Sequence, residues 1–199
     1  MKTLTKTLFA AVLTAIVLTS SAFTSFAAKQ IETVSALTDF NKIWVSGNVR
    51  IVLTQGDTQS ITASDNFDAS KTSVQSKGQT LYINSMEASQ VVLRITVKDL
   101  QRIEAYGQSV IVTSNNFDVK YLQLFLNQSA TAKISANVES LYSVISDKAV
   151  LKINGSADQH SLVASNLKNV KYNNFYSLNT RQYATQAIME ADKTALVSK

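Results

Sequence analysis

The chain has 199 residues, a formal net charge of +5, no cysteine, no proline and a single histidine. Without cysteine it has no disulfide, no cysteine nucleophile and no cysteine-based metal site, and one histidine excludes metal sites that need several. The positive charge is not gathered into a run of Lys or Arg, and no nucleic-acid-binding motif is recognisable. We therefore expect no nucleic acid partner.

The first 27 residues have the pattern of an export signal. Lys2 and Lys6 provide a basic start, residues 8–18 are apolar, and Ser25-Phe26-Ala27 is a small-x-small cleavage site. The apolar run is too short to span a bilayer, so we predict a cleaved signal peptide over residues 1–27; the alternative is a retained helix lying on the membrane. The cleavage site lacks the cysteine of a lipoprotein. We expect an exported protein, periplasmic or extracellular, that is not a lipoprotein and is not membrane-spanning.

The rest of the chain has the pattern of strands. Cleavage leaves 172 residues, enough for one domain with a sizeable core. Residues 45–53 alternate between apolar and polar side chains, as in a strand with one buried face, and Gly56-Asp57 is a turn signal. Residues 91–98 alternate in the same way. No segment before residue 180 has a helical period, so we predict an all-β domain over residues 28–179.

From residue 100 the apolar pattern repeats every 19 residues. Phe125, Val144 and Val163 form one such column. A second set of residues and its copy are Leu122, Leu126, Ala130, Ala132 and Ile134, then Leu141, Ile145, Ala149, Leu151 and Ile153. A repeat of about 20 residues is the size of one β-solenoid coil, in which each coil buries its inward side chains against its neighbours. We predict a single-domain β-solenoid-like stack of short strands; the alternative is a β-sandwich.

Three segments carry a family resemblance. They are VSGNVRIVLTQGD (residues 45–57), QTLYI (79–83) and VKDLQRI (97–103). Together with the later repeats they resemble the head GIN domain family, described as auto-transporter adhesin heads, over about residues 40–175. The family corner Ser-Gly-Ala-Ser is replaced here by Asn-Gln-Ser-Ala (127–130) and Ser-Asp-Lys-Ala (146–149). The resemblance implies an exported β-solenoid protein of Bacteroidetes-like bacteria without accepted catalytic residues.

Catalytic residues are not recognisable. A Ser-His-Asp triad would need His160 together with Asp147 or Asp158, and no nucleophile elbow surrounds the serines. His160 falls in the register of Leu141, and we interpret it as a residue at the edge of a coil. A polysaccharide-acting enzyme would need paired carboxylates. Between residues 121 and 175 the acids are Glu139, Asp147 and Asp158, which we take to lie at dissimilar registers, so we predict no enzyme activity.

Three loops are rich in oxygen ligands. SDNFD (residues 64–68) and SNNFD (114–118) are near copies, and NNF (173–175) is a partial third. They lack the Asp spacing and the central Gly of a calcium loop. We interpret them as turns in which Asn accepts a left-handed backbone while Phe enters the core; calcium loops are the alternative. We expect no metal site and no cofactor.

Lys133, Lys152 and Lys171 occupy the same register in three successive repeats, beside an inward apolar column. On adjacent parallel strands, about 4.8 Å apart, they would form a row on the outer face. Such close like charges repel unless counter-ions or an anionic ligand screen them. We predict an anion-binding surface at these three lysines, suited to an anionic glycan or a membrane headgroup. The alternative is a solvated row that discourages aggregation.

Residues 180–199 differ from the rest, with Ala184, Ile188, Ala191 and Ala195 at helical spacing. We predict a C-terminal cap helix over the last coil, or a tail. The sequence as a whole predicts an exported, non-enzymatic binding protein of the cell envelope or exterior, adhesin-like, with an unknown envelope protein or an anionic glycan as partner. The alternative function is a polysaccharide-acting enzyme on a β-solenoid scaffold.

Overall fold

The structure is a computed structural model that describes residues 29–30 and 38–197. The predicted signal peptide lies outside these residues. The described part is all-β except for a 3-10 turn, η1 (Leu167–Asn169), and one helix, α2 (Gln186–Val197). No described helix is both long and apolar enough to cross a bilayer. The strands are β1 (Lys29–Gln30), β2 (Lys42–Ser46), β3 (Val49–Gln55), β4 (Ser60–Ala63), β5 (Thr72–Lys77), β6 (Thr80–Ser85), β7 (Val91–Val97), β8 (Arg102–Ala105), β9 (Val110–Thr113), β10 (Phe117–Leu126), β11 (Thr131–Ile145), β12 (Val150–Ala164) and β13 (Val170–Tyr183).

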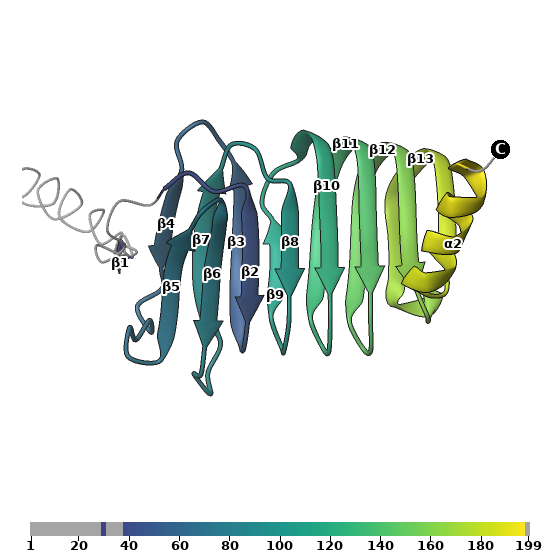
Figure 1. Ribbon diagram of the computed structural model, residues 1–199. Helices are drawn as coiled ribbons and strands as arrows, with labels where there is room; N and C mark the ends of the chain where they lie inside the picture. Colours follow the sequence, from purple (N-terminus) through teal and green to yellow (C-terminus); the bar gives the residue numbers. More distant parts are fainter. Residues whose placement is uncertain (1–28, 31–37, 198–199) are drawn as a thin grey trace, which may run out of the picture.

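The strands form one mostly parallel sheet that curls around the core (Figure 1). The first unit, β2 with β3, lies in the interior of the stack. β6 and β7 pair with it on one side, and β8 and β9 pair with it on the other. β10 to β13 then follow in chain order toward the C-terminal end. The described antiparallel pairs, which involve β1, β4, β5, β6 and β7, all lie at the N-terminal end.

The predicted 19-residue register is confirmed. Leu122 pairs with Leu141, and Ile134 pairs with Ile153, both in parallel. This is not the antiparallel pairing that a β-sandwich would have between successive strands. From β12 to β13 the offset starts at 19 residues and becomes 20 after a bulge at Gly155. Gly155 has φ +109, and a Cβ there would lie 2.0 Å from the carbonyl oxygen of Ala136, so a side chain cannot fit.

Each strand buries alternate side chains, which leaves two outward faces. In β3, for example, Val49, Ile51 and Leu53 are fully buried, whereas Arg50 and Val52 point outward. We call the outward face of β6, β2, β8 and the second parts of β10 to β13 the helix-side face. The outward face of β7, β3, β9 and the first parts of β11 to β13 is the lysine-side face. The interpretation of the asparagine-rich segments is confirmed in part. Phe117 is buried and Phe67 and Phe175 pack on the core, but residues 173–175 lie within β13, and of the asparagines in these segments Asn174 alone has a left-handed backbone.

The C-terminal helix packs on the helix-side face. β13 continues to Tyr183, past the predicted boundary at residue 180, and α2 begins at Gln186. Ile188, which belongs to the predicted apolar column, is 54% exposed, whereas Met189 is 4% exposed and packs on Val144 and Val163. The helix is therefore present, but the residue that anchors it is not on the column that the sequence indicates. A capping role at the end of the stack stays a prediction.

Candidate functional site

The three lysines lie side by side on adjacent strands. Lys133 pairs with Lys152, and Lys152 pairs with Lys171, so their Cα atoms follow one another at the parallel-strand spacing of about 4.8 Å. Their neighbours Ala132 and Ile134 are buried, which turns the lysines outward. Lys133 and Lys171 are exposed and Lys152 is partly exposed. The predicted alignment is confirmed, and the binding of an anion stays a prediction.

Two arginines on the same face were missed by the sequence analysis. The row of lysines (the lysine row) continues through Val112 of β9 and Val52 of β3 to Arg94 of β7. Arg50 lies in the neighbouring row, because it pairs with Val110. Period-two alternation marks both arginines as outward residues in the sequence. Their place beside the lysines depends on the strand order β7-β3-β9, which no repeat in the sequence reveals.

The lysine-side face carries no carboxylate on its described strands. Its outward positions in β7, β3, β9, β11, β12 and β13 are Val92, Arg94, Thr96, Arg50, Val52, Thr54, Val110, Val112, Thr131, Lys133, Ser135, Val150, Lys152, Asn154, Lys171 and Asn173. In the described part of the chain, none of the ion pairs within 4 Å involves these five cations. The potentials of the three neighbouring lysines add, because adjacent strands are closer than the screening length of about 8 Å.

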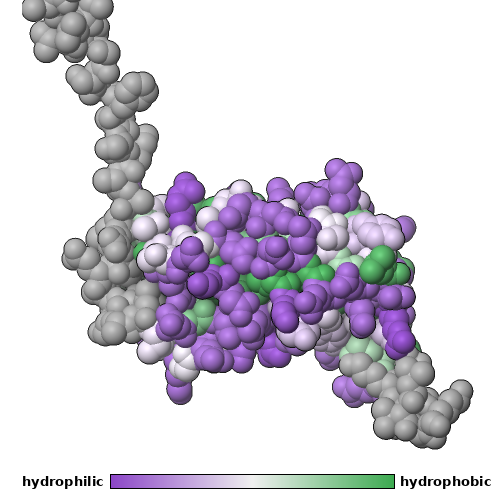
Figure 2. All heavy atoms as spheres, turned by 90° about the horizontal axis from the view of Figure 1, so that it is seen from above, coloured by the Kyte–Doolittle hydropathy of each residue, from purple (hydrophilic) through white to green (hydrophobic). Residues whose placement is uncertain are grey.

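Carboxylates gather instead in a groove at the corners of the stack. A hollow of about 640 Å³ is lined by residues that include Asp57, Asp99 and Asp118, and Lys98 contacts Asp57 at 3.4 Å. It adjoins a hollow of about 370 Å³, with which it shares Asp118. Seen from above, hydrophobic residues form a band along the stack between hydrophilic ones (Figure 2). The cation-rich face is therefore separate from this groove, in which the carboxylates are mixed with Lys98 and Lys120.

One expectation about the acids is wrong. Val138 pairs with Ala157 and Ser140 with Gln159, which places Glu139 beside Asp158 on the next strand. The two acids are 19 residues apart and share a register. Lys120 contacts Glu139 at 4.0 Å, so one of the two carboxylates takes part in an exposed ion pair.

His160 lies inside the core and not at the edge of a coil. It pairs with Leu141 and is 1% exposed. Its Nε2 lies 3.3 Å from the hydroxyl of Ser143, and the rings of Tyr172 and Phe175 meet it edge-on, with centroids 6.1 and 5.5 Å away. Burial lowers the pKa of His160 from 6.5 to about 4. This histidine is enclosed by the core, which makes it unsuited to a triad open to substrate.

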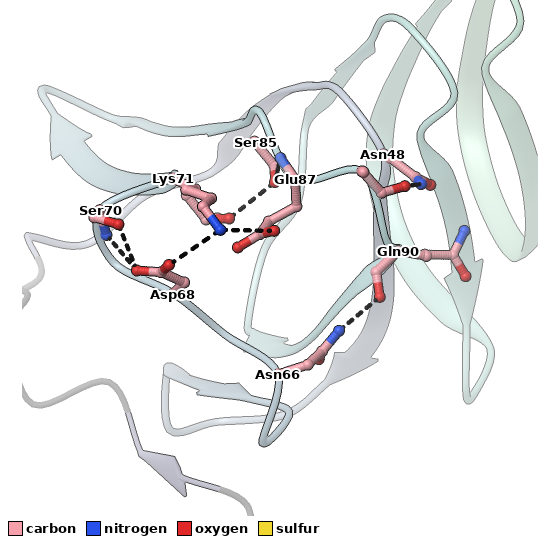
Figure 3. Close-up of polar contacts among 10 residues, drawn as sticks. Asn48, Asn66, Asp68, Ser70, Lys71, Ser85, Glu87 and Gln90 are labelled. Carbon is pink, nitrogen blue, oxygen red and sulfur yellow. Dashed lines mark hydrogen bonds and ion pairs between the residues drawn. The ribbon is translucent and has the colours of Figure 1, made fainter.

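The asparagine-rich loop at residues 64–68 is stabilised by hydrogen-bond donors from the protein itself. Asp68 accepts hydrogen bonds from the backbone N and the hydroxyl of Ser70, at 2.9 and 2.7 Å, and Lys71 lies 3.6 Å from its carboxylate (Figure 3). The hydrogen bonds from Ser70 are the main reason that the pKa of Asp68 lies below its usual value. Lys71 also contacts Glu87 at 3.8 Å. Among the described residues, no three His, Asp or Glu side chains gather as a metal site would require.

The comparisons with known proteins agree with this architecture. Residues 39–181 match the family model "Putative auto-transporter adhesin, head GIN domain". The chain belongs to this family. Its fold is similar to that of a solved Bacteroides fragilis protein titled a putative adhesin, at 17% identity and a TM-score of 0.65, covering 74% of this chain and 72% of the other.

Two further solved structures of similar fold come from Parabacteroides species. One from Parabacteroides distasonis, titled a putative lipid binding protein, is 14% identical with a TM-score of 0.57, covering 74% of this chain and 75% of that one. One from Parabacteroides merdae, titled a putative adhesin, is 14% identical with a TM-score of 0.50, covering 73% of each chain. At these identities the likeness shows the fold alone. No curated protein matches the sequence.

Proposed function

We propose that this head GIN domain protein is an exported, non-enzymatic binding protein of the cell envelope or exterior. Its adhesin-like role is the binding of an anionic glycan by the lysine-side face. The export signal pattern and the family description support the location and the class of function. The repeated parallel pairing at 19 residues supports a β-solenoid, a scaffold that presents long, regular faces to a polymer.

The observation that carries this proposal is the composition of the lysine-side face. Five cations and no carboxylate occupy its outward positions, and three of the cations stand on neighbouring strands. A row that only discouraged aggregation would belong on an edge strand. Lys171 is on β13 at the end of the stack, but Lys133 and Lys152 are on interior strands. A polymer with repeated negative charges would relieve the repulsion along the row.

The test is the triple substitution Lys133→Gln, Lys152→Gln and Lys171→Gln. We expect the natural chain to bind polygalacturonate with an affinity that falls steeply as salt rises, because exposed charges are screened within about 8 Å at physiological ionic strength. Neutral dextran is the control, and no salt-sensitive binding of it is expected. The triple variant should lose the salt-sensitive binding. Its free energy of unfolding should change by less than about 0.5 kcal/mol, since exposed charges contribute little to folding.

A matched variant controls for net charge. Lys77→Gln, Lys98→Gln and Lys120→Gln removes three exposed lysines from other surfaces and should bind polygalacturonate as the natural chain does. Equal losses in the two triple variants would mean that only net charge matters, and would overturn the proposal. The enzyme alternative is tested on the same preparations by release of reducing ends from both polymers. Turnover that Glu139→Gln or Asp158→Asn abolishes would replace the binding role with catalysis.

A further inference from the structure

The helix-side face carries a row of large side chains that runs across seven strands. Tyr82 pairs with Trp44, Trp44 with Glu104, and Glu104 with Phe125. Phe125 then pairs with Val144, and the row continues through Val163 to Tyr183. The row residues from Tyr82 to Val163 alternate with buried neighbours, so their side chains point away from the core, and Tyr183 packs beside Val163 and Met189. This row holds the only tryptophan of the chain.

Arg102 divides the row into two halves. Its guanidinium lies over the ring of Phe125, 5.1 Å from the ring centre, and donates to Gln123 Oε1 at 2.7 Å and to Glu104 Oε1 at 3.2 Å. On the C-terminal side of this cluster, Met189 of α2 packs on Val144 and Val163. The apolar surface that suits a helix ends at Arg102, because a paired guanidinium and carboxylate interrupt it.

The other half is a cluster of three aromatic rings, Tyr82, Trp44 and Tyr106, which we call the aromatic cluster. The ring centroids of Trp44 and Tyr82 are 6.1 Å apart, and those of Trp44 and Tyr106 are 5.5 Å apart. Tyr82 is 42% exposed, and Trp44 and Tyr106 are partly exposed. The contacts between the rings fix their positions, so little rotamer freedom is lost when a ligand covers them.

Polar side chains surround the aromatic cluster on the same face. Lys42 pairs with Thr80 on one side of the ring row, Ser46 pairs with Asn84 on the other, and Glu104 follows Trp44 within the row. These groups both donate and accept hydrogen bonds. The cations and the acid are mixed, so the surface has no single sign of charge like that of the lysine-side face.

We propose that the aromatic cluster binds a neutral polysaccharide chain. A sugar ring has a face of C–H bonds, which packs on the electron-rich face of an aromatic ring, and a rim of hydroxyl groups, which needs hydrogen-bond partners at the edge. Rings 5.5 and 6.1 Å apart offer successive stacking places along a chain. A partner helix would need a continuous apolar stripe, as α2 has at Val144 and Val163, and the Arg102–Glu104 pair prevents this.

The single tryptophan makes the test specific to this surface. Trp44 fluorescence is titrated with neutral glucose oligomers of two to six rings, with glycerol as the control. We expect a saturable change with a dissociation constant in the millimolar range or tighter, and an affinity that rises with length and then levels off. Tyr82→Ala should weaken binding about tenfold, and Tyr82→Phe should keep it within about twofold, because the ring is what the sugar contacts.

Two variants separate this site from the others. Tyr121→Ala removes a tyrosine of the groove that is more exposed than Tyr82, and it should bind like the natural chain. The triple lysine variant should keep the full Trp44 response, so a failure on the lysine-side face does not affect this test. Absence of saturable change up to about 10 mM sugar would overturn the proposal. So would a dimer, seen by sedimentation, that Tyr82→Ala dissociates, because the face would then be an interface between copies.

Discussion

His160 shows how one polar residue is accommodated inside this core. The neighbouring repeat has Leu141 at the same position, and the histidine is closed off by Tyr172 and Phe175. Its Nε2 has the Ser143 hydroxyl nearby, but its Nδ1 is buried without a hydrogen-bond partner among the described residues. The neutral form is tolerated in such a site and the charged form is not, which is why burial lowers its pKa.

The substitution His160→Leu should remove a pH dependence of stability. The pKa of His160 is about 4 in the folded protein, and the ordinary value is 6.5. Above pH 6.5 the residue is therefore neutral in both the folded and the unfolded chain and causes no loss of stability. As pH falls from 6.5 to about 4, the unfolded chain binds a proton that the folded chain does not, and stability is lost by on the order of 3 kcal/mol. Below pH 4 the loss is complete.

The measurement is chemical denaturation of both chains at several pH values between 7.5 and 4. Carboxylates titrate in part of this range, so the difference between the two chains is what isolates the histidine. The variant should gain stability over the natural chain as pH falls. Parallel pH profiles for the two chains would show that the pKa of His160 in the folded protein is not lowered, and would contradict the prediction.

At the scale of strands and helices, the sequence predicts register better than it predicts irregularities. The 19-residue columns identify which residues pair from β10 to β12, because identical spacing places similar side chains on the same face. The same columns place the lysine row. The bulge between β12 and β13 could not be predicted, since it depends on Gly155 and a left-handed Asn174 together. The buried side of α2 could not be predicted either, because it is set by the direction in which the chain leaves β13.

Met189→Ala should detach α2 from the helix-side face. The methionine is 4% exposed and fills the space above Val144 and Val163, so its loss should cost about 2 kcal/mol of local stability. Because α2 lies at the end of the chain, the effect should appear as faster hydrogen exchange in residues 186–197 and not across the sheet. Ile188→Ala, at a 54% exposed neighbour, is the matched control and should exchange like the natural chain. Similar rates in the two variants would mean that Met189 does not hold the helix.

At the scale of the whole molecule, the order of strands is the feature that the sequence conceals. The sequence shows alternating strands before residue 100 and a 19-residue repeat after it, but not that β2 and β3 are placed between the later pairs β6–β7 and β8–β9. The closeness of Arg94 to the lysine row and of Tyr82 to Trp44 follows from this order. Parts of both candidate surfaces could therefore not be predicted from the sequence repeats.

This order also predicts where the protein is most stable. β3 has strands on both sides, β7 and β9, whereas β13 pairs only with β12 among the described strands. In a sheet where each strand contacts only the strands beside it, opening begins at the ends and the interior opens last. Hydrogen exchange should therefore be slowest in β2 and β3 and faster in β13.

Two core substitutions test whether the stack opens in this graded way. Ile51→Ala in β3 removes a fully buried side chain at a cost of about 2–5 kcal/mol, and it should speed exchange in every strand because the interior supports both ends. Val170→Ala at the start of β13 also makes a small cavity, yet it should speed exchange only in β13 and α2. If Val170→Ala accelerates exchange in β3 as much as in β13, the protein unfolds as one cooperative unit and the graded order is wrong.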